Sequence, residues 1–246
     1  MSTIDGSKLK PRPFWQHIAI GTGLLLLGVW MMRFDIVLTE LFDSKNWPGD
    51  LRRIFKLSEI FAHGFGIALI LVSIWLLDPK RRKFIPRLIA CAAFPPITAH
   101  IIKLLAVRKR PTAYLNHLLE PSYPDNGIAT WIGAYQDGQF NTEYMTQAFP
   151  SAHAALVCGI AIGLSYVYPK GRGLFATVAT LACLQRVLFL AHWSSDVVVG
   201  ISLAFLIAGG LVQNWGIGYL CSRVENRGAE SIDSGPELWT PQRRAA

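Results

Sequence analysis

Long apolar runs alternate with short charged segments along the chain, and this pattern predicts a helical membrane protein. The runs are close to the roughly 20 residues that an α-helix needs to cross a bilayer. We expect six spans, at residues 14–32, 57–77, 84–107, 152–168, 174–192 and 196–220. The predicted fold is therefore all-α and polytopic, with six transmembrane helices in a bundle.

Two connecting segments and a pair of prolines refine this picture. Residues 33–56 keep a helical apolar spacing among mixed charges, which favours a short amphipathic helix on the membrane surface. Pro95 and Pro96 should kink the third span. Residues 112–148 form a long extracytoplasmic loop between the third and fourth spans, rich in turn residues and aromatics. Loops of this length are usually functional, and we expect a lid.

The same pattern predicts one membrane domain with two polar tails. Residues 1–13 are expected to be a basic cytoplasmic tail, residues 14–221 the six-span domain, and residues 222–246 a disordered cytoplasmic tail. Basic residues precede the first apolar run, but no small-x-small cleavage site follows it, so we expect a retained span.

Composition narrows the possible partners. The chain is 52% hydrophobic and only 16% charged, with a net charge of +8. Soluble domains have about 25% charged residues. The basic residues lie in short loops beside apolar runs, which argues against nucleic acid and favours membrane lipids with anionic head groups. The sequence pattern gives no indication of the oligomeric state.

Basic residues also predict the orientation in the membrane. With six spans, the amino tail, the 78–87 turn, the 169–173 turn and the carboxy tail share one face, and all are basic. Positive residues mark the cytoplasmic side of membrane proteins. We therefore expect both termini in the cytoplasm and the opposite ends of the spans in the periplasm, in a bacterial inner membrane.

The four cysteines predict neither a zinc site nor a disulfide framework. They lie in apolar runs or at the end of one, and no C-x-x-C pair occurs. We expect buried free thiols at Cys91, Cys158, Cys183 and Cys221.

Two polar clusters lie at the junction of the third and fourth spans. Lys103 and Arg110 are seven residues apart and share a helical face, where they could bind an anion or extend to lipid phosphates. Ser151, in the run Pro150-Ser151-Ala152-His153, is a natural N-cap. A helix N-terminus attracts anions, although plain capping also explains this run.

A third cluster ends the fifth span. Arg186 lies in an apolar run and needs an anionic partner. His192 and Asp196 are four residues apart, and an aspartate beside a histidine can fix its tautomer and stabilise its cation. The alternative to a catalytic role is a purely structural one, in which Arg186 pairs with Asp196 and His192 has its hydrogen bonds satisfied within the protein. All three clusters together favour a site that holds and attacks a phosphate.

In this order the motifs K-x6-R-P, P-S-x-H and R-x5-H-x3-D resemble those of the type-two phosphatidic acid phosphatase superfamily, which includes the vanadium-dependent haloperoxidases. The resemblance is clearest over residues 57–220. Ala152 stands where the family usually has glycine, and Gln185 stands where it usually has serine. Both departures bear on substrate preference more than on catalysis.

The resemblance implies a role for each motif residue. His192 would attack phosphorus, Asp196 would orient His192, and His153 would protonate the leaving oxygen and then activate water. The side chains implied to hold the phosphate are Lys103, Arg110, Ser151 and Arg186. Three fixed cations can neutralise a phosphoryl group, so we expect neither a metal nor a cofactor.

Other polar residues near the clusters have simpler interpretations. Arg108 and Lys109 are expected to extend to lipid phosphates. Glu59 and His63, four residues apart, favour a structural or interfacial pair over a lining for a lipid entrance. His100 could support Lys103 or simply pack.

The predicted function is metal-independent hydrolysis of a phosphate monoester or diphosphate on a membrane lipid. Phosphatidic acid, phosphatidylglycerol phosphate, polyprenyl diphosphate and the phosphates of lipid A all fit. One alternative is transfer of the phosphoryl group from His192 to another lipid. Another is a lipid transporter or lipid-binding protein, although that would not require histidines and an aspartate at these spacings.

Overall fold

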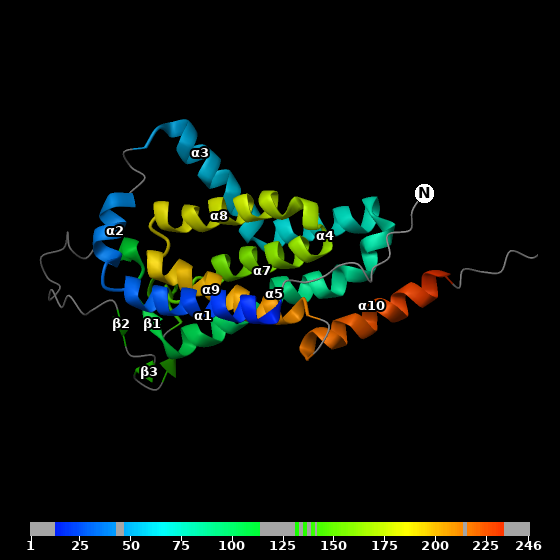
Figure 1. Ribbon diagram of the computed structural model, residues 1–246. Helices are drawn as coiled ribbons and strands as arrows, with labels where there is room; N and C mark the ends of the chain where they lie inside the picture. The colour runs from blue at the N-terminus through cyan, green and yellow to red at the C-terminus, as the bar shows by residue number, and fades with distance from the viewer. Residues whose placement is uncertain are drawn as a thin grey trace, which may run out of the picture.

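The computed structural model is almost entirely helical, in agreement with the predicted all-α class (Figure 1). It describes residues 13–42, 47–113, 131–132, 135–136, 139–140, 142–213 and 216–233. The α-helices are α1 (Phe14–Met31), α2 (Asp35–Phe42), α3 (Gly49–Ser58), α4 (Gly64–Leu77), α5 (Ile85–Leu105), α7 (Ala152–Val167), α8 (Arg172–Leu188), α9 (Ser194–Leu211) and α10 (Ile217–Asp233). The short elements are η3 (Glu59–Ala62), η4 (Pro79–Phe84), η5 (Tyr144–Thr146), η6 (Pro169–Gly171), β1 (Val107–Arg108), β2 (Trp131–Ile132), β3 (Tyr135–Gln136) and β4 (Gln139–Phe140).

Helices α5, α7 and α9 pack together, and α1 lies antiparallel along α9 (Figure 1). Two glycines on α1 allow this close approach. A Cβ at Gly21 would lie 2.7 Å from the Leu206 side chain, and a Cβ at Gly28 would lie 2.6 Å from Val199. The Ser202 hydroxyl donates to the Gly21 carbonyl at 2.7 Å. The start of α9, which carries Asp196, is therefore supported by α1.

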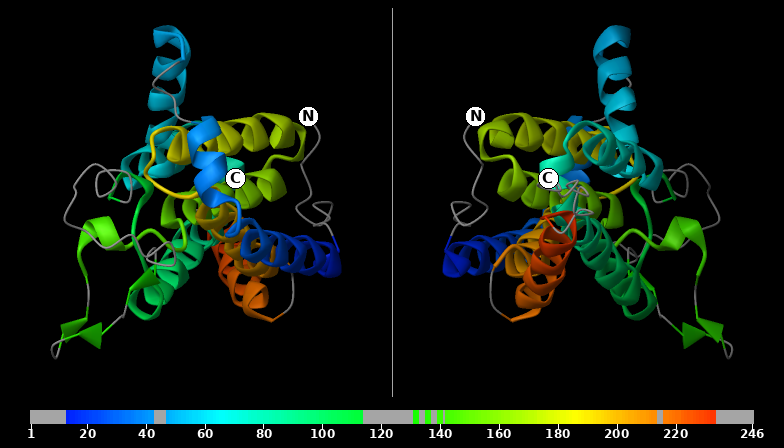
Figure 2. Two further views of the ribbon diagram at one scale, coloured as in Figure 1. Left: turned by 90° about the vertical axis from the view of Figure 1, so that its left-hand side faces the viewer. Right: turned by 90° about the vertical axis from the view of Figure 1, so that its right-hand side faces the viewer.

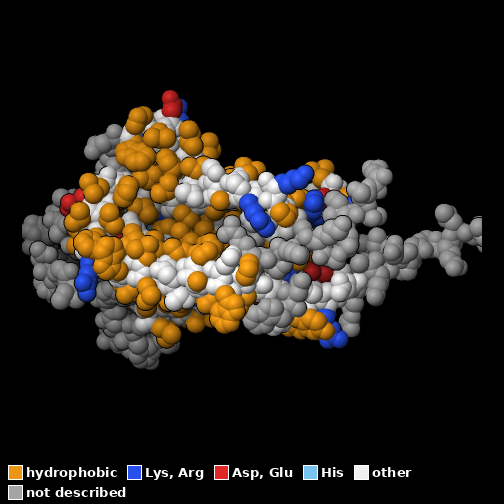
Figure 3. Space-filling model, in the orientation of Figure 1, with side chains coloured by type: hydrophobic (Ala, Val, Ile, Leu, Met, Phe, Trp, Pro, Cys, Tyr) orange, Lys and Arg blue, Asp and Glu red, His pale blue; other side chains and the backbone are white. Residues whose placement is uncertain are grey.

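Three described helices are long and apolar enough to cross a membrane: Phe14–Met31, Pro79–Leu105 and Ser194–Leu211. The pair Gly49–Ala62 and Gly64–Leu77 passes the same test together but bends by 68°. Hydrophobic side chains cover much of the visible face in Figure 3, and Leu77 is 83% exposed. An apolar exterior of this extent is typical of a membrane protein. The six-span count stays a prediction.

Several expected spans differ from the helices observed. Residues 57–77 are not one straight helix, because His63 is extended (φ −111°, ψ 150°) between η3 and α4. Helix α8, which corresponds to the expected fifth span, ends at Leu188 rather than near His192. Residues 33–56 contain two helices, α2 and α3, instead of one, and α3 projects from the bundle (Figure 2). Helix α5 includes both of its internal prolines, and the kink expected there stays a prediction.

The carboxy-terminal segment differs most from its prediction. Disorder from residue 222 is wrong as far as Asp233, because α10 spans Ile217–Asp233. Arg87 on α5 is fully buried and binds the Glu225 carboxylate with two nitrogens, at 2.5 and 2.9 Å. Arg87 Nη1 also donates to the Leu211 carbonyl at 2.6 Å. This ion pair holds α10 against the bundle, and the sequence pattern alone does not pair residues so far apart.

The two ends of the bundle differ in character. The α4–α5 turn, the α7–α8 turn and α10 lie at one end, while β1, β2 and α2 lie at the other (Figure 1). Strand β1 pairs antiparallel with β2, and β3 pairs antiparallel with β4. The lid predicted for residues 112–148 falls largely outside the described residues.

Candidate active site

The three polar clusters meet at the end of the bundle that carries β1. Helices α5 and α8 run towards this end, whereas α7 and α9 begin there, so the motif residues at their ends converge. Their positions are Lys103 in the last turn of α5, Arg110 after β1, Ser151 and His153 at the start of α7, Arg186 in the last turn of α8, His192 between α8 and α9, and Asp196 in the first turn of α9.

His192 is held by its backbone and by one ring nitrogen. The His192 N–H donates to the Arg186 carbonyl at 3.1 Å, and Leu190 adopts a left-handed conformation (φ 56°) that closes the end of α8. The His192 Nδ1 donates to the Ala148 carbonyl at 2.7 Å. A carbonyl only accepts, so the Nδ1 atom carries the proton and the Nε2 atom keeps its lone pair. That lone pair lies 3.5 Å from Nη1 of Arg110.

The charge state of His192 follows from its surroundings. Burial lowers the pKa of His192 well below 6.5, and the nearby charges of Lys103, Arg110 and Arg186 lower this pKa further. The ring is therefore neutral at neutral pH. A neutral imidazole whose unprotonated nitrogen faces a guanidinium is suited to attack an anion that displaces it on that guanidinium.

Asp196 lies close to His192 but is bonded elsewhere. Its Oδ2 is 3.7 Å from the His192 Nδ1, longer than a hydrogen bond. Instead, Asp196 accepts from Arg108 at 2.7 Å and from the Trp193 N–H at 3.0 Å. The direct acceptor for the His192 Nδ1 is the Ala148 carbonyl, while Asp196 holds the neighbouring Trp193 N–H.

Arg108 has a different place from the one predicted. The expected extension to lipid phosphates is wrong, because Arg108 is only 2% exposed. Its guanidinium donates to Asp35 at 2.8 Å, to Asp196 at 2.7 Å and to the Ser195 hydroxyl at 2.8 Å. The sequence offers one signal for this position of Arg108. Asp35 and Asp196 both lie among nearly apolar residues, and a buried carboxylate needs a cation. Arg108 joins α2 to the start of α9.

Lys103 and Arg110 both bind the backbone that precedes α7. Lys103 Nζ donates to the Gln147 carbonyl at 2.5 Å. The Arg110 guanidinium donates to the Tyr144 carbonyl at 2.9 Å and to the Ala191 carbonyl at 2.6 Å. The two cations thereby fix the segment whose carbonyl orients His192, and both lie close enough to His192 to lower its pKa.

Ser151 and His153 begin α7. The Ser151 hydroxyl accepts from the Ala154 N–H at 3.3 Å, which is the predicted N-cap. The Ser151 N–H donates to the Asp196 carbonyl at 3.0 Å. A Cβ at Gly200 would lie 2.4 Å from the Ser151 carbonyl oxygen, so glycine there lets α9 approach the helix start closely. His153 is half-buried beside this contact.

Arg186 has the anionic partner that its apolar surroundings require. It forms an ion pair with Glu59, and its Nε donates to the Gln185 side-chain oxygen at 2.5 Å. The Glu59 carboxylate also lies 3.4 Å from Nε2 of His63. The His63 and His153 rings meet edge to face, with centroids 5.1 Å apart. The Glu59–His63 pair, interpreted above as structural, therefore borders the motif residues.

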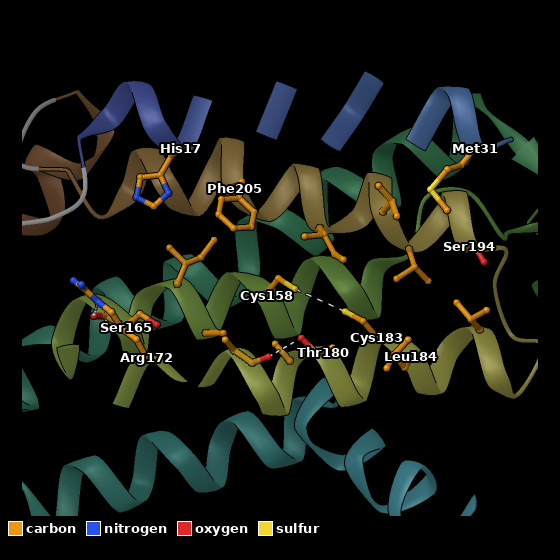
Figure 4. A pocket seen from close by; sticks show the side chains of 18 of the residues that line it. His17, Met31, Cys158, Ser165, Arg172, Thr180, Cys183, Leu184, Ser194 and Phe205 are labelled. Carbon is orange, nitrogen blue, oxygen red and sulfur yellow. Dashed lines mark hydrogen bonds between the residues drawn. The ribbon is translucent and has the colours of Figure 1, made fainter. Parts of the chain in front are cut away.

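The cavity described below does not coincide with these side chains. Among the described residues, no group of three His, Cys, Asp or Glu is placed to hold a metal ion. A cavity of about 560 Å³ runs between α1, α7, α8 and α9 (Figure 4). Its mostly apolar lining includes His17, Cys158, Cys183 and Phe205. The cavity reaches Ser194, but no motif residue lines it.

Comparison with known proteins places this geometry in context. The model of the PAP2 superfamily matches residues 84–216, which is more than half of the chain. The crystal structure of Aquifex aeolicus LpxE is similar, with a TM-score of 0.53 and 18% sequence identity, covering 73% of this chain and 94% of that chain. At this identity the likeness concerns the fold alone. No curated protein matches the sequence.

Proposed function

Because the chain belongs to the PAP2 superfamily, we propose that it is a membrane lipid phosphatase with His192 as its nucleophile. The observation that carries this proposal is the setting of His192. Its Nδ1 donates to the Ala148 carbonyl at 2.7 Å, so its Nε2 keeps a lone pair, which faces Nη1 of Arg110 at 3.5 Å. A phosphate bound by that guanidinium would lie within reach of the lone pair.

The proposed reaction has two steps. The Nε2 lone pair of His192 bonds to phosphorus, the P–O bond to the lipid breaks, and the leaving oxygen takes its electron pair and a proton from His153. In the second step a water molecule gives a proton to His153 while the water oxygen attacks phosphorus. The N–P bond then breaks, and the electron pair of that bond returns to Nε2 of His192. The products are the lipid alcohol, or the lipid monophosphate from a diphosphate, and inorganic phosphate.

The proposed phosphate ligands are the cations and the helix cap. Lys103, Arg110 and Arg186 would neutralise the non-bridging oxygens, and Ser151 would donate a hydrogen bond from the start of α7. Phosphoryl transfer depends mainly on such positioning and charge neutralisation. Because fixed cations supply this charge, the proposed hydrolysis is metal-independent.

The proposed topology follows from the separation of the two ends. Six spans would place the motif residues in the periplasm and the η4 turn, with Lys80, Arg81, Arg82 and Lys83, in the cytoplasm. A lipid phosphate could then reach the site from the outer leaflet while its chains stay in the bilayer. Both termini would be cytoplasmic, and the described residues would form one membrane domain.

The decisive experiment measures release of inorganic phosphate from a panel of lipid phosphates in detergent. We expect His192→Ala to lower the rate at least about a thousandfold, because the nucleophile is lost. His100→Ala is the matched control, since His100 is an exposed histidine on α5. We also expect EDTA to leave the wild-type rate unchanged.

Each other outcome has a defined meaning. Equal release from wild type and His192→Ala would contradict the proposal. Consumption of the lipid phosphate without free phosphate, but with phosphate on a second lipid, would favour the phosphotransferase. Loss of activity in EDTA would contradict the metal-independent mechanism.

A further inference from the structure

Glu59 already occupies the position of an anion on Arg186. Its carboxylate forms an ion pair with the Arg186 guanidinium, and Arg186 itself is only 5% exposed. The Glu59 side chain is 31% exposed, so it lies at the edge of the site, between a buried cation and solvent. A phosphate that binds Arg186 would therefore meet a carboxylate that is already there.

Gln185 holds this carboxylate in place. The Gln185 Nε2 donates to Oε2 of Glu59 at 3.1 Å, while the Gln185 side-chain oxygen accepts from Nε of Arg186 at 2.5 Å. One amide therefore bonds both members of the ion pair. A serine side chain at residue 185 would reach two atoms less far, and it would offer a single hydroxyl in place of the separate amide donor and carbonyl acceptor of glutamine. Gln185, which stands where the family motif usually has serine, therefore has a specific hydrogen-bond partner, Glu59.

The backbone that carries Glu59 is closely packed. Glu59 begins η3, and η3 folds back against α4. A Cβ at Gly66 would lie only 2.1 Å from the Ile60 carbonyl oxygen, so any larger residue would push η3 away from α4. The side chain of Glu59, rather than its backbone, is therefore the part that can move.

We propose that Glu59, held by Gln185, is a specificity-determining residue that the substrate phosphate must displace from Arg186. This inference rests on the proposed role of Arg186 in binding phosphate. Two anions cannot share one guanidinium without repulsion, so each negative charge that a substrate adds beside the reacting phosphate lowers its affinity. Glu59 thereby favours lipid monophosphates over lipid diphosphates.

The test uses orthovanadate, a phosphate mimic, because its binding needs no turnover. Its dissociation constant is measured for wild type, Glu59→Gln, Gln185→Ser and Asp50→Asn in one detergent. Glutamine keeps the shape of Glu59 without its charge, and we expect the constant to fall about fivefold, as for loss of a partly exposed ionic competitor. Gln185→Ser should lower it less, because Glu59 stays charged but loses a hydrogen bond.

Asp50→Asn is the matched control. Asp50 forms a 3.2 Å ion pair with Arg53 on α3 and is 92% exposed, so we expect its substitution to leave vanadate binding unchanged. The kcat/KM for a lipid diphosphate should also rise relative to that for the monophosphate in Glu59→Gln.

Three results would overturn the inference. Unchanged or weaker vanadate binding by Glu59→Gln would show that Glu59 supports the anion site instead of competing for it. Tighter binding by Asp50→Asn as well would show a general effect of net charge. No vanadate binding by any of the four proteins would contradict the phosphate site itself and the proposed function with it. Thermal unfolding of each variant identifies a loss of folded protein.

Discussion

Arg108 links two carboxylates that are far apart in the sequence, Asp35 at the start of α2 and Asp196 at the start of α9. We expect Arg108→Met to destabilise the protein by about 3–5 kcal/mol, because it leaves both carboxylates buried without their cation. Thermal or denaturant unfolding in detergent measures the change. Phosphatase activity should fall as well, since Asp196 would lose its position beside His192.

The control for Arg108 is another arginine paired with an aspartate. Arg53 and Asp50 form an ion pair in which the side chains are 81% and 92% exposed. Solvent-exposed pairs contribute little, so Arg53→Met should leave stability unchanged. Equal stability of Arg108→Met and wild type would contradict the role assigned to the buried pair.

The pH dependence of activity reports on His192. Its lowered pKa means that the neutral nucleophile persists below pH 6.5. As the pH falls, kcat/KM should therefore stay level through 6.5 and decline only at the lowered pKa of His192. Arg110→Gln removes a nearby positive charge and should move the acid limb to higher pH. An acid limb centred at or above 6.5 in wild type would contradict this assignment.

The motif residues could be predicted from the sequence, but most of their bonds could not. Spacing placed His192 and Asp196 one helical turn apart, and they do lie together. The Ala148 carbonyl that bonds His192 carries no side-chain signal, because any residue has a carbonyl. Arg108 was misjudged because a charge at a span end looks the same in sequence whether it faces lipid or a buried carboxylate.

At the scale of elements, the α1–α9 contact depends on glycine. A Cβ at Gly28 would lie 2.6 Å from the Val199 side chain, whereas a Cβ at Gly23 would have no heavy atom within 4 Å. We expect Gly28→Ala to cost about 1–3 kcal/mol through overpacking. Gly23→Ala should be neutral or stabilising by up to about 1 kcal/mol, because alanine favours a helix. Unfolding in detergent measures both.

The comparison of these two alanine variants isolates packing from helix propensity. Both substitutions add the same methyl group to the same helix. If Gly28→Ala were as stable as Gly23→Ala, the close approach of α1 to α9 would be unnecessary for stability.

Helices were predictable from the hydrophobic pattern, whereas their breaks were not. Apolar residues continue from Leu57 to Leu77 on both sides of His63, so periodicity does not reveal the 68° bend. The break depends instead on tertiary contacts, such as that of Glu59 with Arg186. The same holds for α10, whose position depends on the buried pair of Arg87 and Glu225.

At the scale of the whole molecule, the proposed orientation predicts which side each end faces. Single cysteines at Thr142 and Lys80 lie at opposite ends of the bundle, and both parent side chains are exposed. In a variant with the four native cysteines replaced, a membrane-impermeant maleimide should label Thr142→Cys in intact cells. Lys80→Cys should react only after permeabilisation. Labelling of both sites from the same side would contradict the topology.

The overall class and the meeting of the motif residues at one end of the bundle were accessible from sequence, because hydrophobicity and charge are distributed along the chain in order. The packing order was not. Helices α5, α7 and α9 have apolar residues on all of their sides. They meet through side chains such as Cys91 and Leu88, both fully buried. Such helices give no amphipathic face from which to infer neighbours.

Helix α9 carries complementary charges at both of its ends. The Asp196 carboxylate lies in its first turn. The Arg87 guanidinium, from α5, donates to the carbonyl of Leu211, the last residue of α9, and to that of Gln213 just beyond it. A helix dipole is positive at its N-terminus and negative at its C-terminus, so both charges stabilise it. Sliding α9 along its axis would weaken both interactions at once. We therefore expect α9 to stay fixed as a phosphate enters, and the Glu59 side chain on η3 to make the adjustment.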